Sequence, residues 1–345
     1  MMDKSCQGVI VSTPKSPVIF QTGILNLVMN ETHFCRELTR CSGEPIGGSA
    51  PFADQFIFIT WPKKFWNREA LESGGGFPQG LKAWSKSNSS PGNKITIRLL
   101  SKPGLETTSV SLFLFPQAKK ISGLHPEQIP EVLESWLVSP ENLGPRWEPL
   151  ETEQLFVCTH GKHDLCCAKF GQTVYQKLRE EASDRKLELD VWEASHLGGH
   201  RFAANLMRFP GGHSHGHLQE DMVPAFLDDW EAGKIHSPSS YRGCSYLEGK
   251  EQIVSAQLLQ YCSDSGWDVE MDFEKIEEGT ESEFHCEVSL QPRSSKNNGD
   301  SGTTMPRQLR ACFKAKEFQS PGACDALDEI KKRNIWVLHQ VQTLE

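Results

Sequence analysis

Two pairs of candidate metal ligands lie close together in this chain of 345 residues. Cys158 and Cys167 are nine positions apart, and His196 and His200, which are four positions apart, follow 29 residues later. Two thiolates and two imidazoles form a ligand set that suits zinc or an iron–sulfur cluster. These residue types at this spacing indicate metal binding or redox chemistry rather than hydrolysis.

The histidine pair is expected on a loop. A spacing of four would align two imidazoles on one face of a helix, but Gly198 and Gly199 between them lower helix stability by about 2 kcal/mol together. Leu197 stands where a helical zinc protease needs a glutamate, which excludes that class. The glycines would let the backbone approach a cofactor closely. In the alternative interpretation, the two histidines only fill a turn.

The cysteine pair brackets a polar loop that follows a predicted strand over residues 153–158. Ligands of α/β proteins gather at the carboxyl ends of strands, so this loop is a suitable place for a metal. A pair of buried core cysteines is the alternative. Cys166 is adjacent to Cys167, and from the spacing alone either of them could be the ligand.

Two runs of elements in the same order are predicted to position these residues. In the first half, apolar periodicity predicts strands over 55–62, 93–100 and 109–115 and helices over 78–85 and 126–137. In the second half, it predicts strands over 153–158, 187–192 and 203–209 and helices over 167–182 and 219–230. The order β-α-β-β-α therefore occurs twice, which predicts an α/β fold of tandem thioredoxin-like domains.

Four regions are predicted along the chain: an N-terminal extension (1–28), an N-terminal thioredoxin-like domain (29–150), a second such domain with the metal ligands (151–235), and a small C-terminal α+β region (236–345). The C-terminal region is expected to contain helices over 250–262 and 324–332 and strands over 267–273, 283–290 and 334–340. Its segment 292–306 is polar and rich in Gly and Ser, which predicts a flexible loop. The loop 43–51 is expected to pack against the second domain.

The composition excludes several classes of protein. Apolar residues make up 37% of the chain and charged residues 23%, as in a globular protein, and a net charge of −9 disfavours a nucleic-acid partner. The longest apolar runs, such as 55–61, have the length of a strand, so no membrane span is expected. A secretory signal is not visible, and we expect a cytoplasmic protein; an organellar address within residues 1–28 stays open.

Cysteine usage bears on the cellular compartment, and histidine usage marks the segment 160–217 as the centre of the chemistry. The eleven cysteines are odd in number and irregular in spacing, which disfavours a secreted disulfide framework, and no Cys-x-x-Cys occurs. Seven of the twelve histidines fall within 58 residues. Three of these, His213, His215 and His217, alternate in the sequence, which would set them on one side of a strand. We expect them to form a solvated face, with a proton relay or a second, weaker metal site as the alternative.

Four segments resemble the sucrase/ferredoxin-like family. These are VCTHGKHDLCCAKFG (157–171), WEASHLGGHRFAANL (192–206), YRG (241–243) and FCRELTRCSGEPIGGSAP (34–51). The resemblance covers about residues 29–245. It implies a thioredoxin-like fold with a [2Fe–2S] cluster held by Cys158, Cys167, His196 and His200. Cys166 stands at a position that is not a cysteine in the best-understood branch of the family, so Cys167 is the preferred ligand.

Residues beside the four ligands are expected to surround the centre without binding it: Thr159, His160, Gly161, Asp164, Cys166, Gly198, Gly199 and Arg201. The chain departs from the family at 210–218 (PGGHSHGHL), where relatives more often show aromatic or arginine residues.

The expected function is one-electron transfer or redox sensing by a [2Fe–2S] protein, with proton coupling through the histidine ligands. An unidentified redox partner protein would supply or accept the electron. We expect no enzyme, because the ligands lack a nearby trio of nucleophile, base and orienting residue. The first alternative is a zinc-binding structural or interaction module with the same four ligands. The second is a thiol-dependent enzyme that uses Cys158 or Cys166, with His160 or His163 as base.

Overall fold

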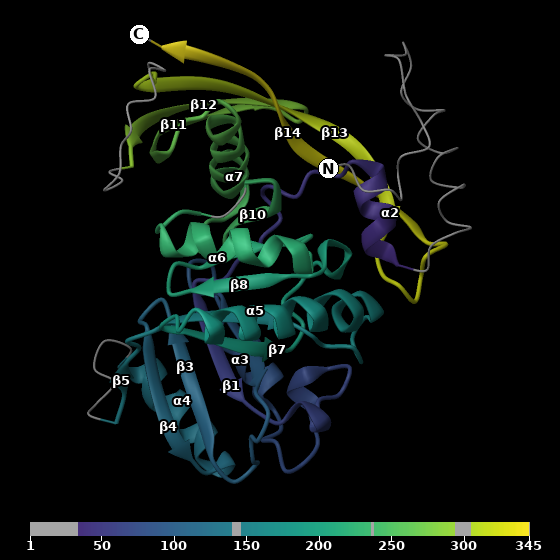
Figure 1. Cartoon of the computed structure of the whole chain (residues 1–345), viewed down its shortest axis with the longest axis vertical. Helices are drawn as coiled ribbons and strands as arrows, with labels where there is room; N and C mark the ends of the chain where they lie inside the picture. The colour runs from purple at the N-terminus through teal and green to yellow at the C-terminus, as the bar shows by residue number, and fades with distance from the viewer. Residues whose placement is uncertain (1–33, 140–145, 236–237, 294–304, 345) are drawn as a thin grey trace.

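The protein was analysed as a computed structural model, which describes residues 34–139, 146–235, 238–293 and 305–344. These residues form a mixed α/β structure with one ten-stranded sheet and one four-stranded antiparallel sheet (Figure 1). The large sheet has the strand order β10-β9-β8-β6-β7-β2-β1-β3-β4-β5. The predicted extension 1–28 and most of the predicted loop 292–306 lie outside the described residues.

The first half of the large sheet is built around one central strand. Strand β1 (Gln55–Thr60) pairs in parallel with β2 (Ile95–Ser101) and antiparallel with β3 (Val110–Phe115), and β4 (Lys119–Leu124) and the short β5 (Glu148–Pro149) continue the sheet. Helices α3 (Leu81–Ser87) and α4 (Ile129–Val138) complete this half. The predicted strands and helices are confirmed. The sequence analysis missed β4, because its run KKISGL has few apolar residues.

The second half repeats this strand order and pairing. Strand β6 (Glu153–Cys158) pairs in parallel with β7 (Leu189–Ala194) and antiparallel with β8 (Leu206–Phe209), followed by β9 (His213–His215) and β10 (Tyr241–Cys244). Helices α5 (Gln172–Asp184) and α6 (Val223–Glu231) lie in this half. Strands β2 and β7 pair antiparallel at Leu100 and Ala194, so both halves belong to one continuous sheet. Strand β10, which was predicted to belong to the C-terminal region, is part of it as well.

The C-terminal region forms its own sheet over one long helix. Helix α7 (Gly249–Asp264) packs against an antiparallel sheet of β11 (Val269–Thr280), β12 (Glu283–Pro292), β13 (Gln308–Pro321) and β14 (Ile330–Leu344). The helix predicted over 324–332 is wrong. Residues 322–329 form the turns that join β13 to β14, and Ile330 to Lys332 already pair with β13. Gly322, Asp325 and Asp328 are typical turn residues, and pairing along the whole hairpin outweighs local helix propensity.

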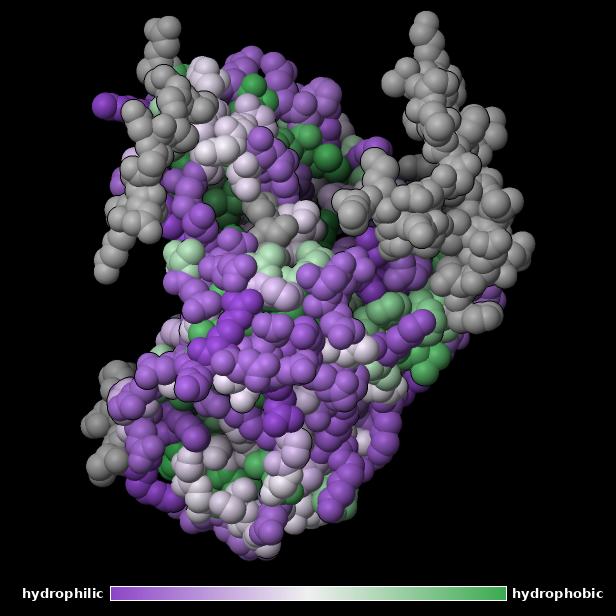
Figure 2. All heavy atoms as spheres, viewed as in Figure 1, coloured by the Kyte–Doolittle hydropathy of each residue, from purple (hydrophilic) through white to green (hydrophobic). Residues whose placement is uncertain are grey.

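Helix α2 (Cys35–Ser42), near the start of the described chain, lies beside the β13–β14 hairpin (Figure 1). The sequence analysis did not predict α2, because its run CRELTRCS is largely polar. Figure 2 shows a mostly hydrophilic face with apolar surface in separate patches. None of the described helices combines the length and apolar character that crossing a membrane requires.

An aromatic core lies between the two halves of the large sheet. Its rings come from both halves: Phe56, Phe58, Phe113, Phe115, Phe156 and Phe209. Each fully buried phenylalanine contributes roughly 1.5–3 kcal/mol to folding. Cys158 and Cys167 pack in this same cluster, so the rigid core of the protein positions the two candidate thiol ligands.

Candidate metal centre

Three of the four predicted ligands converge at the carboxyl ends of β6 and β7. Cys158 ends β6, and His196 follows β7, so the parallel pairing of the two strands brings both residues to one edge. Cys167 begins a π-helical turn that leads into α5. Ligand atoms of Cys158, Cys167 and His196 all lie within 4.8 Å of one another, and both cysteines are buried. The loop predicted around the histidines is confirmed.

Gly171 allows α5 to start directly against the end of β6. A Cβ atom at this position would lie 1.9 Å from the backbone oxygen of Cys158, which is far closer than atoms can approach. The preceding π-helical turn places Cys167 beside Cys158. Such turns often occur at functional sites. The close packing at Gly171 therefore holds the start of α5 against the backbone of Cys158.

Hydrogen bonds favour Cys158 as the thiolate of the converging pair. A hydrogen bond with Cys167 holds the pKa of Cys158 well below its usual range, and bonds with His196 and the backbone of His160 act in the same direction against burial. The same thiol pair raises the pKa of Cys167. Of the two thiols, Cys158 therefore loses its proton more readily. A metal ion would draw off the second proton, since thiolates rather than thiols bind metals.

His196 offers a nitrogen that the described residues leave unsatisfied. Its Nδ1 atom is buried and has no hydrogen-bond partner among them, although buried polar atoms are nearly always paired. Its ring stacks on His163 with the centroids 3.7 Å apart. A nitrogen of the same ring lies within 4.8 Å of two buried thiols, and this donor set fits a soft or borderline metal centre.

His200 is held by a carboxylate on one side of its ring. Its Nδ1–H group donates to Asp164 Oδ2 at 2.8 Å, and its ring centroid lies 5.4 Å from that of His196. This bond places the proton on Nδ1 and leaves Nε2 as the free donor atom. Metal-binding histidines usually have such a carboxylate partner on their second nitrogen. The structure thus brings His200 beside the converging set, with Asp164 as its orienting residue.

Thr159 and His160, which follow Cys158 in the chain, are buried. Thr159 donates from Oγ1 to Glu193 at 2.7 Å. His160 bonds through Nε2 to the backbone oxygen of Asn67 at 2.8 Å and accepts from the backbone N–H of His196 at 3.3 Å. Burial lowers the pKa of His160 to about 4, so this ring is neutral at physiological pH. Its hydrogen bond with the backbone of His196 helps to hold that loop in place.

The chain packs closely on itself at three glycines near the site, Gly161, Gly198 and Gly199. A Cβ at Gly161 would lie 2.9 Å from the Cβ of Ala168. Gly198 and Gly199 have φ values of +88° and +71°, and a Cβ at Gly199 would lie 2.6 Å from the guanidinium of Arg242. The close backbone approach expected at these glycines is therefore to Arg242, which the sequence analysis did not single out although it lies within the YRG segment.

Arg201 and Arg242 hold the surrounding loops. Arg201 forms an ion pair with the buried carboxylate of Glu44 at 2.8 Å. Arg242 donates to the backbone oxygen of Gly198 at 3.0 Å and to Asn205 at 2.9 Å. These contacts fix the loop that carries His196 and His200.

Cys166 belongs to a second set of converging ligand atoms. Ligand atoms of Cys35, Asp164, Cys166 and Cys324 also lie within 4.8 Å of one another. The sequence analysis missed this set. Cys35 and Cys324 are 289 residues apart, and Cys324 was predicted to lie in a helix rather than in the turn where it is found. The structure thus places Cys167, and not Cys166, beside Cys158.

The solvated face expected for His213, His215 and His217 is wrong. His215 is 1% exposed and its ring packs edge-on against Phe226, while His213 Nδ1 lies 3.0 Å from the hydroxyl of Tyr241. Burial lowers the pKa of His213 to about 4 and that of His217 well below its usual value. Apolar neighbours from α6 and β10 cover the strand, which alternation alone does not reveal.

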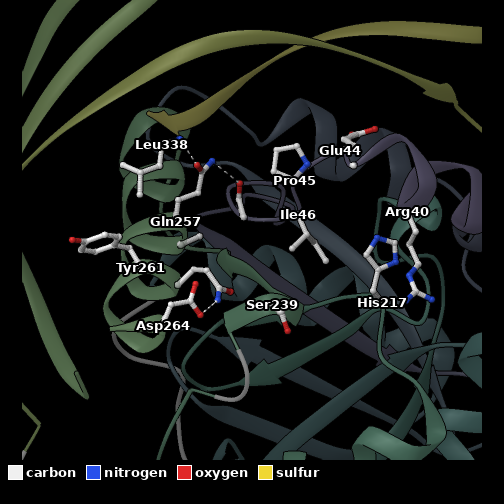
Figure 3. Close-up of a pocket in the computed structure, with 14 residues that line it drawn as sticks. Arg40, Glu44, Pro45, Ile46, His217, Ser239, Gln257, Tyr261, Asp264 and Leu338 are labelled. Atoms are coloured by element: carbon white, nitrogen blue, oxygen red, sulfur yellow. Dashed lines mark hydrogen bonds between the residues drawn. The ribbon is translucent and has the colours of Figure 1, made fainter. Parts of the chain in front are cut away.

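A separate pocket of about 510 Å³ lies between the loop after α2, helix α7 and strand β14 (Figure 3). Its described lining includes Arg40, Ile46, His217 and Tyr261 but no cysteine. Gln257 crosses it, bonding to the backbone of Gly47 and Leu338. The loop 43–51 also packs on the second half as predicted, with Gly48 N–H donating to the backbone oxygen of Arg242 at 2.8 Å.

The chain matches one family model and, over short segments, two curated fungal proteins. A family model described as sucrase/ferredoxin-like matches residues 46–243. The protein named altered inheritance of mitochondria protein 32 from Debaryomyces hansenii is 29% identical over 94 residues, which is 26% of this chain and 34% of the relative. Its namesake from Clavispora lusitaniae is 30% identical over 61 residues, 18% of this chain and 22% of the relative. The chain thus spans about a third or less of these relatives.

Solved structures of a thioredoxin-like [2Fe-2S] ferredoxin from Aquifex aeolicus align with a quarter of the chain. One has 15% identity and a TM-score of 0.22 over 25% of this chain and 86% of the ferredoxin. The wild-type form has 16% identity and a TM-score of 0.24 over 26% of this chain and 96% of the ferredoxin. The family model, by contrast, matches more than half of the 345 residues. The chain belongs to the sucrase/ferredoxin-like family.

Proposed function

We propose that this protein holds a [2Fe–2S] cluster through Cys158, Cys167, His196 and His200 and acts as a one-electron carrier or redox sensor. The observation that carries the proposal is the convergence of Cys158, Cys167 and His196 within 4.8 Å, with His200 next to His196. Such a cluster, when bound, accepts one electron, and histidine ligands raise its reduction potential relative to four cysteines.

The side chains around the proposed ligands favour a stable, water-poor centre. Cys158 and Cys167 are 1% and 0% exposed, so solvent has little access to their sulfurs. The hydrogen bond from His200 to Asp164 holds one proton on Nδ1 of a proposed ligand. The chain therefore contains a group that would couple electron uptake to protonation.

The histidine side of the centre faces the surface and is where we place a redox partner. His196 is only half-buried, and the half-exposed ring of His163 stacks on it. Leu165, in the same loop, is 57% exposed and is one of two large apolar side chains that the described residues leave so accessible. An apolar contact beside these half-exposed imidazoles would let a partner protein approach the ligands closely.

The fungal relatives carry a name that refers to mitochondrial inheritance. For this chain we keep the cytoplasm as the proposed location and treat an address within residues 1–28 as the competing hypothesis. Subcellular fractionation of the full chain with a C-terminal tag distinguishes the two.

Metal analysis of the anaerobically purified full chain tests the proposal. We expect about two iron and two sulfide ions per chain and visible charge-transfer absorption, as a [2Fe–2S] centre requires. Cys158→Ser should lose the iron, whereas Cys41→Ser, a matched change at a cysteine outside the site, should keep it. Zinc in place of iron at Cys158 and Cys167, even after anaerobic reconstitution, would instead support the structural zinc module.

A further inference from the structure

We propose that Cys35, Cys166, Cys324 and Asp164 form a second metal site, which takes a single zinc ion and is separate from the proposed cluster. The four residues come from three distant parts of the chain: helix α2, the loop after β6, and the turn between β13 and β14. Their ligand atoms lie within 4.8 Å of one another. Nothing in the family match assigns this site.

The three sulfur atoms form a triangle of the size that a tetrahedral zinc ion needs. Cys35 Sγ lies 3.6 Å from Cys166 Sγ and 3.6 Å from Cys324 Sγ, and Cys166 Sγ lies 3.1 Å from Cys324 Sγ. Zinc–sulfur bonds of about 2.3 Å at tetrahedral angles place two sulfurs roughly 3.8 Å apart. One ion in the middle would therefore reach all three thiolates with small shifts.

Asp164 would complete the tetrahedron as the oxygen ligand. It is 6% exposed, and its two oxygens are held by the backbone N–H groups of Cys166 and Cys324, at 2.8 and 2.9 Å. Both donors belong to residues whose thiols are in the site, so the carboxylate is fixed next to them. Three thiolates with one further ligand are a usual set for structural zinc, and zinc also binds aspartate oxygens.

Burial around the thiols suits a structural ion rather than an open catalytic one. Cys35 and Cys166 are 0% exposed, and Cys324 is half-buried. The apolar side chains packed around them include Phe34, Phe170 and Leu327. The backbone N–H of Cys35 points at Cys324 Sγ over 3.4 Å, a contact that stabilises a metal-bound thiolate.

The site is distinct from the proposed cluster although the two are neighbours. Cys166 and Cys167 are adjacent in the chain, and their sulfurs belong to different sets. Asp164 connects them, since its Oδ2 atom also accepts from His200. The zinc ion would thus fasten α2 and the C-terminal hairpin over the loop that carries the cluster ligands. Its binding free energy would add to the stability of that closed arrangement.

Zinc content of the full chain tests this site. Elemental analysis of wild type and Cys41→Ser should give about one zinc per chain, and Cys35→Ser and Cys324→Ser should each lose it while keeping iron and visible absorption. Cys41 is the matched control, because it lies on the same helix as Cys35. Cys158→Ser should lose iron and keep zinc, so failure of the cluster and failure of the zinc site give different results.

Zinc-edge X-ray absorption on the wild-type chain gives a readout that needs no variant. We expect three sulfur neighbours at about 2.3 Å and one oxygen or nitrogen at about 2.0 Å. Absence of zinc after refolding or dialysis with zinc would overturn the proposal. So would zinc that persists in both Cys35→Ser and Cys324→Ser, or a non-reduced mass two hydrogens lighter that maps to a Cys166–Cys324 disulfide.

Discussion

His200 Nδ1 donates a hydrogen bond of 2.8 Å to Asp164 Oδ2. The same carboxylate accepts from the backbone of Cys166 and Cys324, so one buried side chain touches both sets of converging ligands. Burial acts to raise the pKa of Asp164, but the hydrogen bonds from His200 and the two backbone groups hold it well below its usual range. Asp164 therefore stays charged and connects the proposed cluster to the proposed zinc site.

Replacing Asp164 by asparagine should weaken both metal centres. The amide keeps the shape but loses the charge that orients His200 and binds zinc, and loss of such a partner usually lowers metal affinity 10- to 100-fold. Iron and zinc retention against a chelator measures this effect. Asp190→Asn, which removes a carboxylate paired with Lys102 at 2.6 Å, is the control. An Asp164→Asn protein that holds both metals like wild type would contradict the assigned role.

The adjacent cysteines should behave in opposite ways. Cys167→Ser is expected to abolish the iron-dependent visible absorption, because its sulfur lies beside Cys158. Cys166→Ser should keep that absorption and lose zinc, because its sulfur faces Cys35 and Cys324. Absorption spectra and elemental analysis of the two variants check this pair. Loss of iron from Cys166→Ser with retention in Cys167→Ser would reverse the assignment.

Acid should destabilise the fold through His160. The unfolded chain binds a proton at this residue below about pH 6.5, whereas the folded ring does so only near pH 4, because burial disfavours its charged form. Stability is therefore fully present above pH 6.5 and is lost as the pH falls toward 4. Between pH 7.5 and 5 this residue should cost the folded state about 2 kcal/mol.

Denaturant unfolding of wild type and His160→Gln at both pH values measures that contribution. Glutamine does not titrate, so the variant should lose about 2 kcal/mol less than wild type over the same interval. An identical pH dependence in the two proteins would show that His160 is not the responsible group.

Gly171→Ala should disturb the thiol pair. The new Cβ would lie 1.9 Å from the backbone oxygen of Cys158, so either α5 or the end of β6 must move, at a cost of about 1–3 kcal/mol or more. Iron retention and the midpoint of denaturant unfolding should both fall. Gly74→Ala, whose Cβ would meet no atom closer than 4.0 Å, should leave both unchanged. If both variants retained iron and unfolded at the same denaturant concentration, Gly171 would not be needed for the packing of α5 against β6.

Local patterns predicted the elements that carry the proposed cluster. Strands β6 and β7 carry buried apolar residues at their carboxyl ends, where Cys158 is the last residue of β6 and His196 lies in the loop after β7. Parallel pairing of two strands brings their carboxyl ends together, so this convergence follows from short segments. Gly198 and Gly199 also indicated correctly that the histidines lie on a loop and not on a helix.

The second ligand set depends on contacts that no local pattern contains. Cys324 reaches Cys35 only because β13 and β14 pair along their full length and carry the turn to α2. Helical periodicity misled the prediction over 324–332, since pairing with β13 decides the conformation of this segment. The burial of His215 has the same origin, because Phe226 and Tyr241 that cover it come from later elements.

The paramagnetic resonance spectrum of the reduced full chain tests the proposed cluster most directly. We compare wild type with His196→Cys and His200→Cys, in which thiolate replaces imidazole at one ligand position. Wild type should give a one-electron [2Fe–2S] signal, and each variant should keep a signal with shifted g values. A wild-type chain that shows no signal after anaerobic reconstitution and reduction, or variants with unchanged g values, would contradict ligation by these histidines.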